Sequence, residues 1–255
     1  MKLATWNVNS LNVRLPHLLD WLRDAEPDVV ALQELKMVDE KFPHEAIEAA
    51  GYTAVCNGQK TYNGVALLAR KPLLLEDVSR NLAGFEDEQR RVIAATVDGV
   101  RVVSVYVVNG QAVGSEKFDY KLRFLAALQD YLQGELLRHP RLVVMGDYNI
   151  APTPEDSHDP AQWEGNILCS PPERAALQGL LELGLTDAFT KPFLPEGRFT
   201  WWDYRMAGFR RNLGLRIDHI LLSAPLLESV REWKVDTAPR KLERPSDHAP
   251  VVVTL

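Results

Sequence analysis

Leu142-Val143-Val144-Met145-Gly146-Asp147-Tyr148-Asn149 is the stretch that decides the fold. Its first four residues form an apolar run, which is typical of a buried strand, and polar residues follow directly. Gly, Asp and Asn all favour turns, so an ordinary turn explains Gly146, Asp147 and Asn149. The alternative is that a carboxylate and an amide at alternate positions both face a phosphate, where the amide donates to an oxyanion.

The same pattern, a short apolar run with polar residues at its end, recurs along the chain. Strands that end in this way gather carboxylate and amide oxygens at one rim of a sheet, and a hard cation such as Mg²⁺ needs such ligands. A histidine beside them would add proton transfer or phosphate binding. The further members are Asn7 after Leu3–Trp6, Glu34 after Val29–Leu32, Asp218 with His219, and Asp247 with His248.

The composition is that of a globular protein and leaves the kind of partner open. The 255 residues, 46% hydrophobic and 25% charged, suffice for one large domain or two small ones. A net charge of −6 argues weakly against a nucleic-acid partner. However, a metal site concentrates carboxylates, a bound cation reverses the local field, and Arg205–Arg211 is basic with an aromatic residue inside it. The charge balance therefore does not decide the question.

The cysteines and the N-terminus favour a reduced, cytoplasmic setting. Cys56 and Cys169 are far apart and form no Cys-x-x-Cys pair, which argues against a thiolate zinc site. The first residues, Met1–Asn7, lead straight into a strand and do not resemble a signal peptide. No apolar run approaches the ~20 residues that cross a bilayer. We expect a soluble cytoplasmic monomer with no membrane contact.

Helical and strand periodicities alternate, and they predict an α/β protein. Apolar residues at helical spacing predict helices over 12–24, with Pro16 in the first turn, and over 115–138, with Ser115 as the cap. Asp98-Gly99 between two apolar runs predicts a hairpin. The second half repeats the order of strand, long helix and strands. We therefore expect a four-layer α/β sandwich, two packed mixed sheets flanked by helices, as a single domain over 1–255.

The histidine near the C-terminus is either a surface loop residue or part of a general-base unit. In the second interpretation Asp218 fixes the tautomer of His248, as a carboxylate does in many catalytic sites. No Gly-x-Ser-x-Gly elbow accompanies it, which argues against a serine hydrolase. Glu34 follows a buried strand directly, so we choose it as the principal metal ligand, with Asn7 beside it.

Several aromatic and basic residues keep two interpretations. Tyr106 is either a strand aromatic or a phenol that contacts phosphate. Trp201-Trp202 is either core or a stacking surface for a base or an abasic sugar. Arg90-Arg91 and the stretch around Phe209 are either a solvated basic face or phosphate contacts.

The order of these motifs carries a resemblance that no single motif carries. The chain resembles the exonuclease III-type AP endonucleases of the endonuclease/exonuclease/phosphatase superfamily over nearly its full length. The motifs concerned are 6–10 (WNVNS), 33–36 (QELK), 62–66 (YNGVA), 106–110 (YVVNG), 146–152 (GDYNIAP), 199–205 (FTWWDYR), 215–220 (LRIDHI) and 246–250 (SDHAP).

The resemblance implies a Mg²⁺-dependent phosphodiesterase, with Mn²⁺ as a substitute, that acts on damaged double-stranded DNA. It would cleave 5′ to abasic sites and also act as a 3′→5′ exonuclease and a 3′-end-trimming phosphodiesterase or phosphatase. The resemblance leaves open whether one or two metals act, and whether Asp147 or His248 takes the proton. The implied catalytic residues are Tyr106, Asp147, Asn149, Asp218 and His248; the metal-site residues are Asn7, Glu34, Asp147, Asn149, Asp247 and His248; the DNA contacts are Arg90, Asn109, Trp202, Phe209 and Arg210.

One departure and two rival functions accompany the resemblance. Many relatives have Pro where this chain has Val108, which loosens the loop but leaves Tyr106 and Asn109 in place. The first rival keeps the chemistry and takes a phospholipid headgroup, an inositol phosphate or another nucleotide. The second rival is a non-catalytic binding module, against which the complete set of catalytic residues argues.

Overall fold

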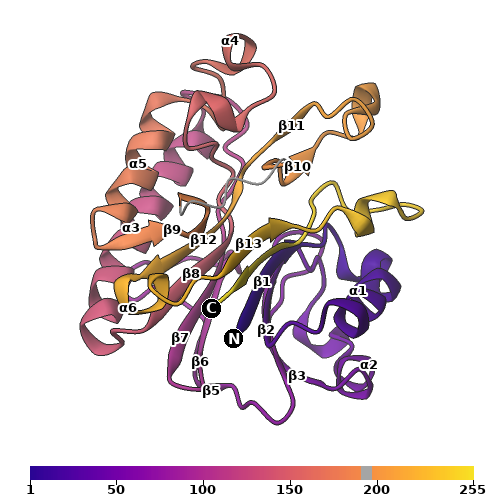
Figure 1. The fold of residues 1–255 in the computed structure, drawn as a ribbon. Helices are drawn as coiled ribbons and strands as arrows, with labels where there is room; N and C mark the ends of the chain where they lie inside the picture. The colour runs from indigo at the N-terminus through magenta and orange to yellow at the C-terminus, as the bar shows by residue number, and fades with distance from the viewer. Residues whose placement is uncertain (191–196) are drawn as a thin grey trace.

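Two six-stranded sheets pack face to face with helices on both outer sides, as Figure 1 shows. The computed structural model describes residues 1–190 and 197–255. Along one sheet the order is β13-β14-β1-β2-β4-β3, and along the other it is β5-β6-β7-β8-β12-β9. Each sheet contains one parallel pair, β1 with β2 and β7 with β8, so both are mixed. The predicted sandwich of two mixed sheets flanked by helices is confirmed.

The strands lie within a residue or two of most of the predicted runs. Asp98 and Gly99 both have positive φ, 49° and 72°, so the predicted tight hairpin joins β6 and β7. The first sheet consists of β1 (Lys2–Asn7), β2 (Val29–Gln33), β3 (Tyr52–Asn57), β4 (Val65–Arg70), β13 (Glu232–Val235) and β14 (Val251–Thr254). The second consists of β5 (Glu76–Ser79), β6 (Val92–Val97), β7 (Val100–Tyr106), β8 (Leu142–Asp147), β9 (Leu185–Asp187) and β12 (Asp218–Ser223).

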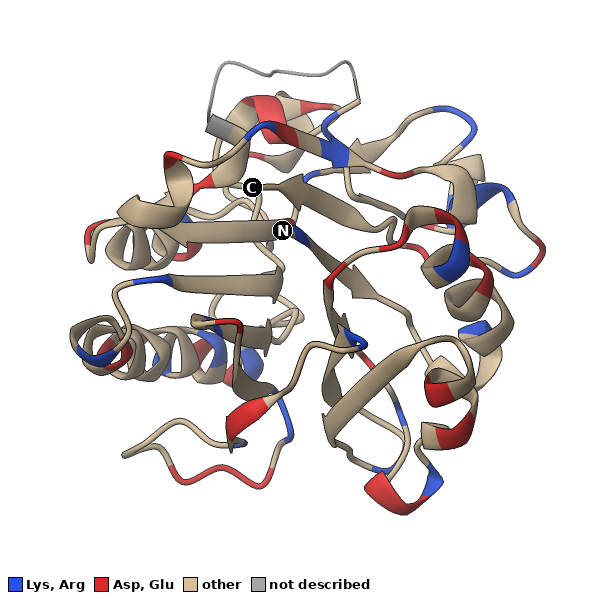
Figure 2. Cartoon of the chain, turned by 60° about the horizontal axis from the view of Figure 1, so that its bottom comes forward, with Lys and Arg blue, Asp and Glu red and all other residues tan. Residues whose placement is uncertain are grey.

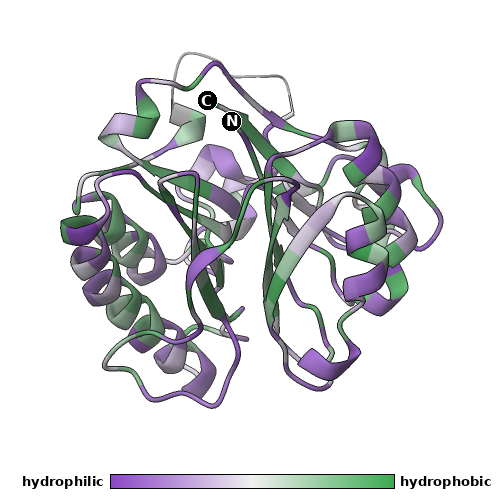
Figure 3. Cartoon of the chain, turned by 90° about the horizontal axis from the view of Figure 1, so that it is seen from below, coloured by the Kyte–Doolittle hydropathy of each residue, from purple (hydrophilic) through white to green (hydrophobic). Residues whose placement is uncertain are grey.

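Residues of the central strands alternate between two cores, because these strands are buried on both faces, whereas the edge strands β5 and β13 are partly exposed. One face of each sheet meets the other sheet in a core that includes Ala31, Val102 and Met145. The opposite faces pack under the helices, and in the view of Figure 3 the hydrophobic strands lie inside the more hydrophilic helices. Such two-sided burial accounts for uninterrupted apolar strands.

Helices α1, α2, α3 and α5 cover the two outer faces. Helix α1 (Leu11–Ala25) and α2 (His44–Ala49) lie on the first sheet, and α3 (Glu116–Arg138) and α5 (Pro171–Leu181) lie on the second. Ser115 caps α3, because its hydroxyl accepts from the Phe118 amide at 3.2 Å, as predicted. Pro16 lies inside α1 and not in its first turn, so that detail of the prediction was wrong.

Two predicted segments are subdivided. The apolar run 215–222 is two strands, because β11 (Gly214–Leu215) pairs with β10 (Trp201–Trp202) and β12 starts only at Asp218. The loop predicted over 151–170 contains two short helices. The short elements are α4 (Pro160–Trp163), α6 (Ala224–Leu227), η1 (Asp39–Lys41), η2 (Pro154–Asp156), η3 (Ala188–Thr190), η4 (Arg205–Ala207) and η5 (Ala238–Lys241).

Charged residues lie mostly on helices and loops, while the strands in Figure 2 carry few. The two termini meet at one end of the sandwich, where the Met1 amino group donates to the Leu255 carbonyl at 3.3 Å. Among the helices in 1–190 and 197–255, none has the length and apolar character that a membrane span requires.

Candidate active site

Strand pairing brings the polar strand ends to one rim. Asn7 and Gln33 are neighbours at the ends of parallel β1 and β2, and Tyr106 and Asp147 are neighbours at the ends of parallel β7 and β8. Strand β12 runs the other way, so its first residue, Asp218, lies opposite Asp147. Residues from four separate parts of the chain therefore meet where the two sheets face each other.

Asn7 connects the two sheets at the centre of this rim. Its amide nitrogen donates to Glu34 Oε1 and to Asp147 Oδ2, each at 2.9 Å. Asn7 and Asp147 are buried, whereas Glu34 keeps about 18% of its side chain exposed. The carboxylate that reaches solvent is thus tied by one buried amide to the carboxylate behind it.

The His248 imidazole lies between two carboxylates. Its Nδ1 is 2.9 Å from Asp218 Oδ2, and its Nε2 is 3.6 Å from Asp147 Oδ2. Burial disfavours the imidazolium, but Asp218 and then Asp147 outweigh it and raise the pKa of His248 to about 10. The predicted pairing of His248 with Asp218 is present in this structure, with Nδ1 held on the carboxylate and Nε2 directed to the reactive side.

Asp147 is surrounded by donors and removed from water. The Asn149 backbone amide donates to Oδ1 at 2.9 Å, and the Asn149 side chain donates to Oδ2 at 3.3 Å. Burial raises the pKa of Asp147 to about 7, and His248 opposes that effect. Asn149 has φ of 50°, which makes the turn that returns both of its amides to Asp147.

Tyr106, at the end of β7, and Asn109, in the loop that follows, flank this centre. Burial, and then the Glu34 and Asp147 carboxylates, raises the pKa of Tyr106 well above its ordinary value, so the phenol is a hydrogen-bond donor at neutral pH. The Arg91 guanidinium lies 4.9 Å from the Tyr106 ring centre. The exposed Asn109 amide lies 3.5 Å from Asn149 Oδ1. Both predicted residues thus adjoin the Glu34–Asp147–His248 group.

Asp247 lies at the edge of the site and not within its central group. Its two oxygens accept from Asn9 Nδ2 and from Trp201 Nε1, each at 2.9 Å. Lys36 connects it to the centre, because Lys36 Nζ is 2.6 Å from Asn9 Oδ1 and 2.9 Å from Glu34 Oε2. Lys36 and Asn9 lie in the motifs 33–36 and 6–10, but a lysine and an asparagine there do not by themselves indicate a role.

The residues at the rim fit a divalent cation. Glu34, Asp147 and His248 each offer one ligand atom, and these atoms lie within 4.8 Å of one another. Carboxylate oxygens are the ligands a hard cation prefers, so Glu34 and Asp147 suit Mg²⁺ or Mn²⁺ better than the His248 nitrogen does. Glu34 would hold the cation from the solvent side, with the Asp147 carboxylate behind it.

The predicted DNA contacts fall into exposed and buried groups. Arg210 and Asn109 are exposed, and Arg90 and Phe209 are half-buried. Trp202 is only 3% exposed, its Nε1 donates to Asn212 Oδ1 at 3.1 Å, and its ring meets Phe209 edge-on at 5.1 Å. Trp202 therefore supports the loop over 203–213 from beneath, while Phe209 and Arg210 belong to that loop.

Three buried residues that the sequence analysis missed fix the site from behind. Ser246 donates to the Asn7 carbonyl at 2.7 Å and accepts from the His248 amide at 3.2 Å. Thr200 Oγ1 accepts from the Asp218 amide at 3.1 Å. Lys121 is fully buried inside the apolar stripe of α3. The sequence around each of them gives little indication of this role, because each binds a segment far away along the chain.

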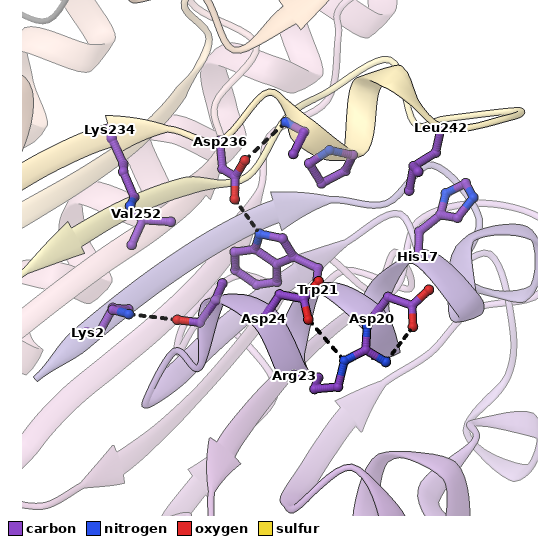
Figure 4. Close-up of a pocket in the computed structure, with 13 residues that line it drawn as sticks. Lys2, His17, Asp20, Trp21, Arg23, Asp24, Lys234, Asp236, Leu242 and Val252 are labelled. Carbon is purple, nitrogen blue, oxygen red and sulfur yellow. Dashed lines mark hydrogen bonds and ion pairs between the residues drawn. The ribbon is translucent and has the colours of Figure 1, made fainter.

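A separate cavity of about 410 Å³ lies between α1 and the segment 234–242, shown in Figure 4. None of the predicted catalytic or metal-site residues lines it. Its charged side chains are occupied: Arg23 pairs with Asp20 and Asp24, and Asp236 accepts from Trp21 Nε1 at 2.9 Å. The catalytic chemistry therefore belongs to the rim and not to this cavity.

The comparisons with known proteins agree with this geometry. The family described as the endonuclease/exonuclease/phosphatase family matches residues 4–248. Exodeoxyribonuclease III of Haemophilus influenzae is 38% identical over 98% of both chains. The structure of the 3′ phosphatase NExo from Neisseria, bound to a product DNA hairpin, is 50% identical with a TM-score of 0.97, covering 100% of this chain and 99% of that chain. An AP endonuclease from Archaeoglobus fulgidus is 38% identical with a TM-score of 0.94, at the same coverage. The chain therefore belongs to the endonuclease/exonuclease/phosphatase family, among its hydrolytic nucleases of the exonuclease III type.

Proposed function

We propose that this chain is a Mg²⁺-dependent DNA-repair phosphodiesterase that cleaves duplex DNA 5′ to abasic sites and trims 3′ ends. The observation that carries the proposal is the meeting of Glu34, Asp147 and His248 within 4.8 Å, with Asp218 behind the histidine. Carboxylates and an imidazole in this arrangement suit attack of water on a phosphodiester. The relatives named as a 3′ phosphatase and an AP endonuclease support the choice of substrate.

In the proposed reaction Asp147 accepts the proton of the attacking water. Asn7 and Asn149 hold its carboxylate through hydrogen bonds from both sheets. His248 contacts a phosphoryl oxygen through Nε2, because Asp218 occupies Nδ1. The Tyr106 phenol donates to a remaining oxygen as negative charge builds up, and the Asn149 side-chain amide joins it by exchanging its longer hydrogen bond to Asp147 for one to the phosphate.

A divalent cation held by Glu34 would neutralise charge on the phosphate and on the leaving oxygen. The protein would supply duplex contacts around this centre through Arg90, Asn109, Phe209 and Arg210. An abasic nucleotide would enter more readily than a paired one, because extruding it costs less unstacking and unpairing energy. The loop supported by Trp202 would form one wall of the entry.

The test is cleavage of three labelled duplexes, which carry an abasic site, a 3′-phosphate or a recessed 3′-hydroxyl. We expect a nick 5′ to the abasic site and release at the 3′ ends with Mg²⁺, and no reaction in excess EDTA. The Asp147→Asn and His248→Ala variants should lose on the order of 10³-fold in kcat. Full activity of the wild type in EDTA would reject the metal requirement.

Small phosphodiesters and an inositol phosphate serve as the comparison substrates. If the protein hydrolyses them faster than any duplex, the phospholipid or nucleotide rival is correct. If all substrates remain intact with Mg²⁺ and with Mn²⁺, the non-catalytic rival is correct. Release of phosphate from the 3′-phosphate duplex, with the abasic duplex left intact, would restrict the proposal to 3′-end trimming.

A further inference from the structure

Lys121 is a buried cation that contacts two loops of the active-site rim and the first turn of α5. Its side chain is fully buried, and its ammonium donates to the Asn149 carbonyl at 2.7 Å and to the Asn109 carbonyl at 3.0 Å. Its third donor goes to the Glu173 carboxylate, which is also fully buried. All three N–H groups of the ammonium are therefore used, each on a different loop or helix start.

Glu173 extends the same connection into the loop before α5. One oxygen accepts from the Leu168 amide at 3.0 Å, and the other accepts from the Ser170 amide at 3.1 Å and the Ser170 hydroxyl at 2.6 Å. This is a capping box at the first turn of α5. The Ala151 amide donates to the Leu168 carbonyl. The segment 149–151 is therefore held by Lys121 at Asn149 and by Leu168 at Ala151.

The loop after β7 is shaped to admit the Lys121 side chain. Gly110 has φ of 95°, and a Cβ there would lie 3.2 Å from Lys121 Cδ and 3.0 Å from Ile167 Cδ1. Glycine alone adopts such a positive φ without strain and has no Cβ to fill the small space left there. The Asn109 carbonyl reaches the ammonium as a result, and the Asn109 side chain lies 3.5 Å from Asn149 Oδ1.

We propose that Lys121 is a positioning residue of the reaction, which fixes the Asn109 and Asn149 loops through their backbone carbonyls while Glu173 compensates its charge. This role rests on the proposed function, because Asn109 and Asn149 act there on DNA and on the phosphate. A shift of about 1 Å in such groups costs on the order of 10²-fold in rate. A neutral side chain of the same length would fill the space but release both carbonyls.

A second buried pair on the same helix provides a matched control. Arg101 Nε lies 2.6 Å from Glu135 Oε2, and the two side chains are 5% and 3% exposed. This pair joins α3 to β7 and contacts Asp77, Ser79 and Thr96, none of which belongs to the rim. Its loss should lower stability without affecting Asn109 or Asn149.

The experiment compares Lys121→Met, Lys121→Met with Glu173→Gln, and Arg101→Met with Glu135→Gln. In the single variant an unpaired buried carboxylate destabilises the fold. In the first double variant the neutral amide removes the charge, but its NH₂ then faces one of the backbone N–H groups that donate to Glu173. We expect the first double variant to regain part of the lost melting temperature. Its kcat on the abasic duplex should stay about 10²-fold low, with KM little changed. The control double variant should keep the wild-type kcat.

A second measurement does not depend on activity. Nitrogen-15 NMR of the Asn109 and Asn149 side-chain amides should show shifted or broadened signals in the Lys121 variants and unchanged signals in the Arg101 control. A wild-type kcat together with unmoved amides in the restabilised double variant would overturn the inference. If the wild-type protein cleaves no substrate, the proposed function fails, and the amide signals alone decide whether Lys121 orders the two loops.

Discussion

Asp218 and Asp147 are direct partners in the antiparallel register of β12 and β8, and the His248 imidazole lies between their carboxylates. The register fixes the spacing of the two acids through backbone hydrogen bonds and not through flexible side chains. His248, from the segment before β14 of the other sheet, therefore meets one carboxylate on each ring nitrogen. Asp218 therefore holds Nδ1 of His248, while Asp147 faces Nε2 on the reactive side.

The first prediction concerns Asp218→Asn. An asparagine can present its amide to Nδ1 and favour the wrong tautomer of His248, so we expect kcat to fall by about 10²- to 10⁴-fold. The fold should persist, because the substitution preserves shape. Steady-state cleavage of an abasic duplex measures the loss. Asp236→Asn, at an aspartate that accepts from Trp21 in the separate cavity, is the control and should retain wild-type kcat.

The second prediction concerns the cation. Glu34→Gln should raise the Mg²⁺ concentration for half-maximal activity by 10-fold or more, roughly the size known even for indirect partners of metal ligands. Lys36→Met should act in the opposite direction, because the Lys36 ammonium competes for Glu34 Oε2 at 2.9 Å. Calorimetric titration of the DNA-free protein with Mn²⁺ provides a binding measurement. Equal Mn²⁺ affinities in wild type and Glu34→Gln would contradict the assignment of Glu34.

The sequence was most informative where burial on both faces forces a continuous apolar strand. Leu142–Met145 and Val29–Leu32 are such strands, and the polar residues that follow them, Asp147 and Glu34, do meet at the rim. The hairpin at Asp98 was equally predictable, because few residues tolerate the left-handed turn. These features depend only on local sequence.

The features that could not be predicted depend on contacts between residues far apart in the sequence. Asn7 and Asp147 were expected at one metal site, but the direct hydrogen bond between them, across 140 positions, depends on the packing of one sheet on the other. Lys121 lies on the buried and mostly apolar face of α3, where its residue type alone predicts a solvated lysine. Trp202 was open between core and stacking surface, and the structure buries it because Phe209 and Asn212 fold over it.

The third prediction is a pH dependence of stability. Burial alone would raise the pKa of Asp156, but Arg216 and Thr153 bind the carboxylate and lower that pKa below its ordinary value. The stabilisation is therefore complete above the unfolded-state pKa of about 3.9 and is lost as the pH falls through the lower folded-state value. Asp156→Asn should cost about 3 kcal/mol in the free energy of unfolding at pH 7. Urea unfolding at several pH values should show this difference shrink below pH 4, and a constant difference would contradict the prediction.

The fourth prediction contrasts two glycines. A Cβ on Gly146 would lie 1.9 Å from the Val105 carbonyl oxygen, whereas a Cβ on Gly134 in α3 would meet nothing within 4 Å. Gly146→Ala should therefore destabilise the protein by about 3 kcal/mol or more, since the clash is with backbone. Gly134→Ala should stabilise it by about 0.5–1 kcal/mol, because alanine favours the helix. Chemical unfolding of both variants measures the contrast, and similar effects at the two sites would refute it.

The fifth prediction separates recognition of the duplex from chemistry. Arg240 is only 6% exposed, lies 4.8 Å from the Phe209 ring centre, and donates to the Ser246 carbonyl. It thus connects the loop over 203–213 to the segment that bears Asp247 and His248. Arg240→Met should raise KM for an abasic duplex by about 10-fold, the equivalent of 1.4 kcal/mol, because the loop loses a buried cation–π contact.

A small activated phosphodiester does not need that loop, so its hydrolysis should change much less in Arg240→Met. Arg23→Met is the control, because Arg23 pairs with Asp20 and Asp24 on the surface of its own helix, and it should leave both substrates unaffected. Equal losses on the duplex and on the small phosphodiester would mean that Arg240 acts through His248 and not through the loop. In that case the Ser246 carbonyl, and not the Phe209 ring, is the contact that matters.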